Sequence, residues 1–263
     1  MKKLVQAGLL IAMCMPSAAM AQSSFDGTWK IDLSKVQMPK KPDVMLLQDG
    51  MYQCKTCIPV INIKADGQDQ KISGDPYIDA MSIKVVDAQT ILETDKKGRK
   101  TVGTSTTTVA KDGATASFEF TDSSNTNGAP VTGKGTMTRV EKGSAGSHAI
   151  SGSWRTSKLD NVSDNGLAVT FKVEGDSLHM TDPTGHSYVA KMDGTDSPYK
   201  GDPGTTSVSV KRISKDVVEE TDKRDGKAIS IAKMTVSADG KSLTFAVHNV
   251  RQGTDSTFVG VKQ

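Results

Sequence analysis

The sequence predicts an all-β protein in which one β-barrel unit occurs twice along the chain. Three observations lead to this prediction: an internal repeat, alternation of apolar and polar residues with a period of two, and glycine-containing turns that recur along the chain. An antiparallel up-and-down barrel closes its own sheet edges, so it suits short strands joined by tight turns. We therefore expect two tandem antiparallel up-and-down β-barrels of roughly eight strands each and no substantial helix.

The first element is a predicted signal peptide, residues 1–21. Lys2 and Lys3 precede a short apolar run, and small residues lead to an expected cleavage site after Ala21. A lipoprotein signal that uses Cys14 is an alternative, which we weigh lower because the residue before it is not small. We expect export to the periplasm of a Gram-negative bacterium or secretion into the medium.

The overall charge is close to neutral. The 263 residues include 33 Lys and Arg against 30 Asp and Glu, for a net charge of +3. Loss of Lys2 and Lys3 with the signal peptide lowers it to +1. Basic residues are scattered, so the sequence argues against a nucleic-acid partner. No apolar run is long enough for a transmembrane segment, and the oligomeric state cannot be inferred.

The repeat defines the expected domains. Phe25–Lys30 (FDGTWK) matches Ile150–Arg155 (ISGSWR) at an offset of 125 residues. At an ungapped offset of 127, the 55 positions 66–120 contain 18 identities with the second copy. Matches of this density indicate a duplication. We expect one barrel from residues 23–141, a linker of small residues at 142–146, and a second barrel from residues 147–263.

Within each copy the pattern indicates strands joined by turns. Apolar residues alternate with polar ones over residues 81–85 and 208–211, which is typical of half-buried strands. Residues 101–109 and 228–236 are rich in the Thr, Val and Ile that favour strands. Pairs such as Asp-Gly recur between these segments, as hairpin loops require. Only residues 33–35 suggest a helical turn.

The Gly-x-Trp of each copy resembles the opening strand of the lipocalin and fatty-acid-binding-protein group. Its residues here are Gly27 with Trp29 and Gly152 with Trp154, and Thr138–Glu141 is similar to the closing strand of that group. The wider spacing resembles a set of uncharacterised exported bacterial proteins with lipocalin-like folds. The resemblance implies two lipocalin-like barrels. Glu141 stands where the closing strand usually has Tyr, and the helical lid is missing, so fatty-acid binding is not implied.

The pair Cys54 and Cys57 is the sharpest local motif. A turn brings residues three apart close enough for a disulfide, and we interpret the pair as a structural disulfide within a hairpin. Redox activity and metal binding remain alternatives. Thiol–disulfide enzymes place such a pair at a strand-to-helix turn, whereas strand residues flank this one, and the first copy contains no His to complete a zinc site.

A second candidate is the predicted hairpin tip in the second copy. If Thr181 pairs with His186, then His179 pairs with Tyr188 and both His side chains face one side. This tip is a candidate ligand or metal site, although two ligands without a third make a poor one, and we assign no metal. By the repeat alignment the tip corresponds to the region of Cys54, where the copies differ most.

Acidic residues suggest two further sites, both of which we interpret as ordinary surface. The DGxD loops at Asp66 and Asp193 lack the further ligands of a calcium loop and favour turns. The alternate carboxylates Glu93 and Asp95, repeated as Glu220 and Asp222, could act as an acid–base pair. Next to lysines, they are interpreted as a solvated strand end.

These observations favour a binding protein over an enzyme. The sequence carries no GxSxG, HExxH, Walker or GxGxxG motif, so no catalytic residue and no cofactor is assigned. We expect an exported non-catalytic protein that binds a small apolar or amphipathic molecule in a barrel. The alternative is a structural or protein-interaction module of the cell envelope with filled barrels.

Overall fold

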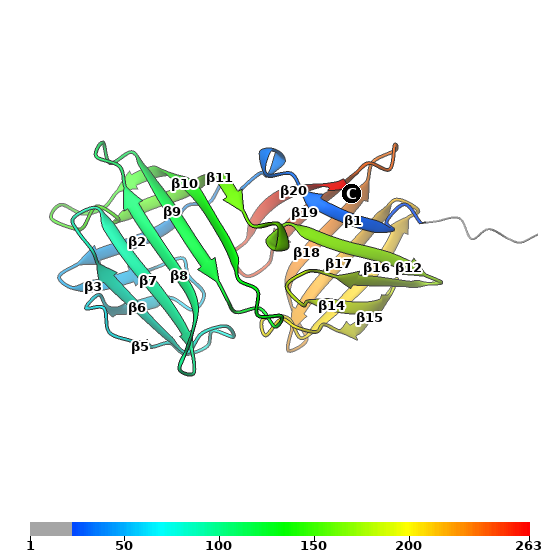
Figure 1. Cartoon of the computed structure of the whole chain (residues 1–263), viewed down its shortest axis with the longest axis horizontal. Helices are drawn as coiled ribbons and strands as arrows, with labels where there is room; N and C mark the ends of the chain where they lie inside the picture. Colours follow the sequence, from blue (N-terminus) through cyan, green and yellow to red (C-terminus); the bar gives the residue numbers. More distant parts are fainter. Residues whose placement is uncertain (1–22) are drawn as a thin grey trace, which may run out of the picture.

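The computed structural model describes residues 23–263; the predicted signal peptide lies outside them. These residues form two antiparallel sheets of ten strands, each curled into a nearly closed barrel, and the two barrels lie next to each other along the long axis (Figure 1). The all-β prediction of two tandem barrels is confirmed, with ten strands in each sheet rather than eight. Within these residues no helix has the length and apolar character needed to cross a membrane.

The first barrel follows the order β4-β3-β2-β11-β10-β9-β8-β7-β6-β5. An isolated bridge joins Asp66, just after the edge strand β4, to Lys84 of β6, the neighbour of the other edge strand β5. Its strands are β2 (Asp43–Gln48), β3 (Met51–Cys54), β4 (Ile61–Lys64), β5 (Gln70–Lys71), β6 (Ala80–Val85), β7 (Thr90–Lys97), β8 (Lys100–Val109), β9 (Thr115–Asp122), β10 (Val131–Lys142) and β11 (Gly152–Val162).

The second barrel follows the order β14-β13-β12-β1-β20-β19-β18-β17-β16-β15. A bridge between Ser187 and Lys200 draws its edges together. Its strands are β12 (Ala168–Glu174), β13 (Ser177–Thr181), β14 (Ser187–Lys191), β15 (Asp193–Pro198), β16 (Ser207–Ser214), β17 (Val217–Arg224), β18 (Lys227–Val236), β19 (Ser242–Asn249), β20 (Thr254–Lys262) and β1 (Gly27–Ile31).

The two copies exchange their opening strands. Strand β1 begins the first copy but pairs with β12 and β20 of the second barrel. Strand β11 begins the second copy but pairs with β10 and β2 of the first barrel. Because β1 and β11 are equivalent positions of the repeat, each fills the place that the other leaves. The expectation that each copy folds into its own barrel is therefore wrong.

The exchange also moves the connections between the barrels. The predicted linker, residues 142–146, belongs to the turn between the paired strands β10 and β11, so it lies within the first barrel. The chain instead crosses from one barrel to the other at residues 32–42 and again at residues 163–167, which contain the 3₁₀ turns η1 (Leu33–Lys35) and η2 (Asp164–Gly166). Pro39 and Pro42 favour an extended backbone in the first crossing segment.

The signature tryptophans lie at the centre of the two cores. Trp29 and Trp154 are both fully buried, Trp29 in the core of the second barrel and Trp154 in that of the first. Each indole nitrogen donates to the carbonyl of the residue four positions earlier, at 3.0 Å and 2.7 Å. The guanidinium of Arg139 lies 3.9 Å from the centroid of the Trp154 ring and donates to the carbonyls of Ala149 and Ser151.

The glycine of each Gly-x-Trp is required by backbone geometry. Gly27 and Gly152 both have φ of +129°, a conformation that side chains with a Cβ rarely adopt. A Cβ at Gly152 would collide with the carbonyl oxygen of Glu141, and one at Gly27 would lie 2.8 Å from Cε of Lys262. The motif therefore allows the chain to enter the barrel beside the closing strand.

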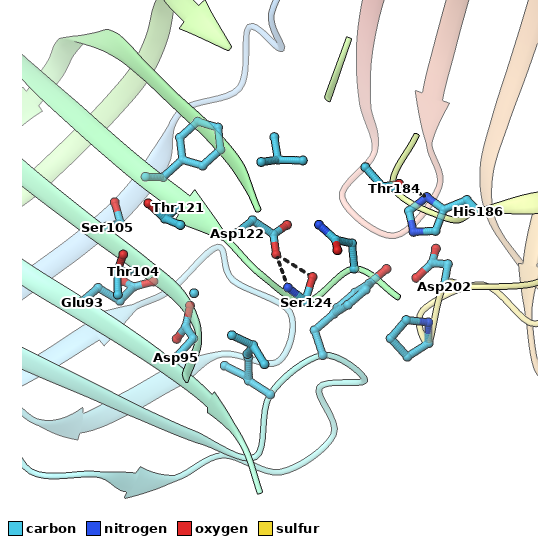
Figure 2. Close-up of a pocket in the computed structure, with 18 residues that line it drawn as sticks. Glu93, Asp95, Thr104, Ser105, Thr121, Asp122, Ser124, Thr184, His186 and Asp202 are labelled. Carbon is cyan, nitrogen blue, oxygen red and sulfur yellow. Dashed lines mark hydrogen bonds between the residues drawn. The ribbon is translucent and has the colours of Figure 1, made fainter. Parts of the chain in front are cut away.

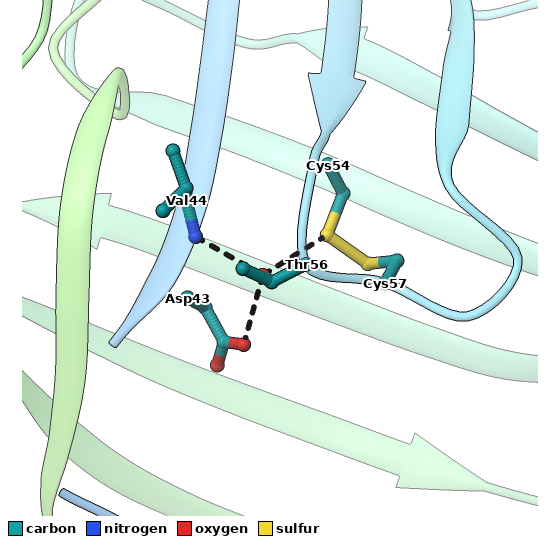
Figure 3. Close-up of a disulfide and its surroundings, with 5 residues drawn as sticks. All are labelled: Asp43, Val44, Cys54, Thr56 and Cys57. Carbon is teal, nitrogen blue, oxygen red and sulfur yellow. Dashed lines mark hydrogen bonds between the residues drawn. A yellow bond between two sulfur atoms is a disulfide. The ribbon is translucent and has the colours of Figure 1, made fainter. Parts of the chain in front are cut away.

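Cys54 and Cys57 form a disulfide, as predicted (Figure 3). The bond closes the loop between β3 and β4, and Cys54 belongs to the core of the first barrel. The hydroxyl of Thr56, inside the loop, donates to Asp43 at 3.1 Å and accepts from the backbone N–H of Val44 at 3.1 Å. The loop is thus held against the start of β2.

We expect thiol labelling of unfolded, unreduced residues 22–263 to find neither Cys54 nor Cys57 free. Replacing both by Ser should lower the free energy of unfolding by about 2 kcal/mol, because closure of so short a loop removes little entropy from the unfolded chain. Urea unfolding with and without the substitution measures this. Two reactive thiols in protein isolated from an oxidising compartment would contradict the assignment.

Candidate ligand site at the mouth of the first barrel

A cavity of about 510 Å³ lies in the first barrel and opens towards the second barrel. Strands β7, β8 and β9 form its inner wall, and loops of the second barrel complete its rim. Figure 2 shows Glu93 and Asp95 on one side, His186 and Asp202 on the opposite side, and Asp122 between them. The site therefore exists only when both barrels are in place.

Glu93 and Asp95 point into this cavity from β7. Residues two apart on a strand share a face, and the same face carries Ile91, which is 3% exposed and belongs to the core. Lys96 lies on the opposite face and forms an ion pair with Asp69 at 2.6 Å. The interpretation of this pair as a solvated strand end is wrong.

Burial changes the proton affinity of both carboxyl groups. Burial, together with the charge of Asp95, raises the pKa of Glu93 to about 8. Burial and the charges of Asp75 and Asp122 raise the pKa of Asp95 to about 6. Oδ1 of Asp95 is buried and has no hydrogen-bond partner among residues 23–263. Within the described residues, this end of the cavity carries negative charge without a cationic partner of its own.

The outer part of the cavity is also acidic. Asp122 accepts hydrogen bonds from the N–H and hydroxyl of Ser124, at 2.8 Å and 2.6 Å. Asp202 of the second barrel accepts from the N–H of Gly204 at 2.8 Å. His186 lies 3.0 Å from Asp182, which raises the pKa of the imidazole and balances its charge. The cavity thus contains four carboxylates and one imidazole that is already paired.

Tyr77 joins the two barrels at the rim. Its side chain packs against Gly204, where an added Cβ would collide with the phenolic oxygen. Burial and a hydrogen bond to Asp202 raise the pKa of Tyr77. The absence of a side chain at residue 204 therefore allows Tyr77 of the first barrel to pack directly against the second barrel.

The second barrel contains the same pair of acids in a different environment. Burial, together with the charge of Asp222, raises the pKa of Glu220 to about 8, and burial raises that of Asp222 to about 6. Here the hydroxyl of Tyr188 donates to Glu220, and the ring of Tyr199 lies 5.8 Å from that of Tyr188.

The first barrel lacks these two hydroxyl groups. At the offset of 127, Ile61 and Ile72 occupy the positions of Tyr188 and Tyr199. Both isoleucines are buried in the first core, and an isoleucine side chain cannot donate a hydrogen bond to the acids. In the second barrel a tyrosine hydroxyl therefore contacts the acid pair, whereas the acids of the first barrel line a cavity.

The structure does not bring the predicted hairpin-tip residues together. Thr181 pairs with Ser187 rather than with His186, so His179 lies opposite Val189 and Met180 lies opposite Tyr188. A register shift of one residue moves a side chain to the other face of a sheet. His179 lies 3.5 Å from Glu174, while Tyr188 points into the barrel.

His186 alone of the three predicted tip residues reaches the cavity. Across residues 23–263, no group of three or more His, Cys, Asp and Glu side chains is arranged to hold a metal ion. The DGxD aspartates form turns, since Asp66 and Asp193 each accept from the backbone N–H two residues on, both at 2.9 Å.

The sequence identified the acids of β7 as a candidate pair but not their burial, although one signal indicates it. Glu93 has the same strand parity as the apolar Ile91, and both acids are identical in the two copies. Parity with a core residue predicts an inward direction more directly than polarity predicts exposure.

Comparisons with protein-family models, with curated proteins and with solved structures found no match to the chain.

Proposed function

We propose that the protein is an exported binding protein whose first barrel holds a small amphipathic cation, such as an amine. The observation that carries the proposal is the cavity of about 510 Å³ with four carboxylates and no unpaired basic side chain among its described lining residues. A buried carboxylate is stabilised when an opposite charge comes within a few ångströms. An ammonium group would supply the missing charge.

The rest of the cavity supports an amphipathic ligand. Ile78, Val102, Phe120 and Val131 line the wall beside the acids, so an apolar body has surface to bury while its ammonium contacts Glu93 and Asp95. A purely apolar ligand would leave those carboxylates both desolvated and unpaired, which costs free energy.

The proposed role is binding without catalysis. The acid pair recurs in the second barrel, where the hydroxyl of Tyr188 donates to Glu220, so the pair belongs to the repeat rather than to one reactive centre. A disulfide at Cys54 and Cys57 supports export, because such bonds persist in oxidising compartments. Residues of the second barrel complete the rim of the cavity, which supports a structural or protein-interaction role for that half as the alternative.

Titration calorimetry with three probes of similar size tests the charge preference. We expect 2-phenylethylamine to bind at least tenfold more tightly than 2-phenylethanol, and 3-phenylpropionate not to bind; tenfold corresponds to about 1.4 kcal/mol. Binding of the amine should strengthen between pH 5 and pH 8, because the pKa values of Asp95 and Glu93 are about 6 and about 8. Binding of the alcohol as tight as that of the amine would contradict the proposal.

The duplication provides a matched control for the location of the site. Glu93→Gln with Asp95→Asn should weaken amine binding at least tenfold, whereas Glu220→Gln with Asp222→Asn should leave it within twofold. Equal loss in both double variants would place the site elsewhere. Mass spectrometry of protein purified gently from its host should then detect a bound amine, while a co-purifying protein would favour the interaction role.

A further inference from the structure

A second groove, which shares no lining residue with the acidic cavity, has the opposite charge. Its volume is about 380 Å³, and three segments that are distant in sequence form it: the first crossing segment, the disulfide loop, and the turn between β19 and β20. A hydrogen bond from Nζ of Lys41 to the carbonyl of Gln252, at 3.0 Å, joins the crossing segment to that turn. We call this site the basic groove.

Three cations line the basic groove: Lys41, Lys55 and Arg251. All three residues are exposed, and none of them forms an ion pair with another residue in the range 23–263. The one acid in its lining is Asp43, whose carboxylate accepts a hydrogen bond from Thr56. The groove therefore carries a net positive charge that no neighbouring carboxylate removes.

Apolar side chains lie beside these cations. Val60 is 65% exposed and Ile58 is 39% exposed, and both line the groove together with Met38 and Pro39. Cys57 also lines it, so the disulfide holds this wall in place. Exposed apolar surface beside unpaired positive charge matches a molecule with an apolar body and one anionic group.

We propose that the basic groove binds a small, soluble anionic amphiphile, such as a medium-chain carboxylate. The carboxylate would lie between Lys55 and Arg251, and the apolar chain would cover Ile58 and Val60. Guanidinium and ammonium groups form charge-assisted hydrogen bonds with carboxylates, and burial of the exposed isoleucine and valine adds apolar contact. The groove is separate from the acidic cavity, so the two proposals stand or fall independently.

Displacement of 1-anilinonaphthalene-8-sulfonate by decanoate tests the proposal on the whole exported chain. We expect decanoate to displace the dye, and decanol and decyltrimethylammonium to do so at least tenfold less well. Equal displacement by decanol would overturn the proposal, since charge would then play no part. Binding to phosphatidylglycerol vesicles without displacement by free decanoate would overturn it in favour of a membrane surface.

Charge reversal at exposed positions locates the site. Lys55→Glu and Arg251→Glu should each weaken decanoate binding at least fivefold. Lys215→Glu, at the opposite end of the second barrel, should have no effect because that side chain is 90% exposed and far from the groove along the strands. Reduction of the disulfide should also weaken binding. Unchanged binding in the Lys55 and Arg251 variants, or equal loss in the Lys215 variant, would overturn the assignment.

Glu93→Gln with Asp95→Asn separates this result from the function proposed above. This double variant should bind decanoate as the unmodified chain does, while its amine binding falls. Loss of decanoate binding in that variant would show that the acidic cavity, not the basic groove, takes the anion, and would overturn the proposal.

Discussion

Replacing Trp29 by alanine is expected to destabilise the second barrel, although Trp29 belongs to the first copy of the repeat. Its side chain is fully buried among residues of the second core, and its indole N–H donates to the carbonyl of Phe25. Substitutions of a buried tryptophan by alanine typically cost about 3–5 kcal/mol. The loss should appear in strands β12 to β20, not in strands β2 to β10.

Hydrogen exchange measured peptide by peptide checks this expectation. In Trp29→Ala, peptides from β13 and β19 should lose protection first, and peptides from β3 and β8 should keep theirs. Trp154→Ala is the matched variant, because Trp154 fills the first core and should show the reverse pattern. Loss of protection in the copy that contains the substituted residue would contradict the strand exchange.

Removing the charge from the β7 acids should stabilise the first barrel, with the larger gain at high pH. The pKa of Glu93 is raised to about 8 in the folded chain, above its ordinary value of 4.5, and that of Asp95 is raised to about 6. The folded state thus binds these protons more tightly than the unfolded state does. Their contribution to stability is full below about pH 4 and is lost as the pH rises towards 8.

Glu93→Gln with Asp95→Asn should therefore be more stable than the unmodified chain at pH 8 by about 2 kcal/mol or more, given about 1.4 kcal/mol for each tenfold change in proton affinity. The difference should shrink at pH 5. Urea unfolding at both pH values measures it. Glu119→Gln, on an exposed position of β9, is the control and should change the free energy of unfolding by less than about 0.5 kcal/mol.

The same substitutions link stability to the proposed binding. The charged acids lower the free energy of unfolding of the empty barrel at neutral pH. A bound cation should raise it again, because the cation stabilises the charged acids and binds only the folded barrel. A double variant that is less stable than the unmodified chain at pH 8 would argue against buried, unpaired charge at this position.

Much of the fold could be predicted because its signals are local. Alternation around Met81 and Ile83, the Asp-Gly turns and the ungapped repeat each depend on neighbouring residues or on comparison within the chain. The disulfide was predictable for the same reason, because Cys54 and Cys57 lie within one turn. For the β7 acids, the strand parity that they share with Ile91 predicts an inward direction, whereas their polarity predicts exposure.

The hairpin tip shows where local reasoning fails. The pairing of Thr181 with Ser187 rather than with His186 differs from the expectation by one residue, yet it places His179 and Tyr188 on opposite faces. The register between β13 and β14 depends on which of their side chains pack into the core. Here Met180 and Tyr188 are buried in the second core, and that requirement decides the pairing.

By itself the sequence determined that the chain is all-β, duplicated, built on Gly-x-Trp opening strands, and closed at one hairpin by a disulfide. The tertiary structure alone decided which barrel each opening strand joins. FDGTWK and ISGSWR occupy equivalent positions of the repeat and share the Gly-x-Trp motif, so this motif does not assign either strand to a barrel. The choice depends on how the crossing segments connect two barrels, and only the assembled pair reveals the acidic cavity, because the second barrel completes its rim.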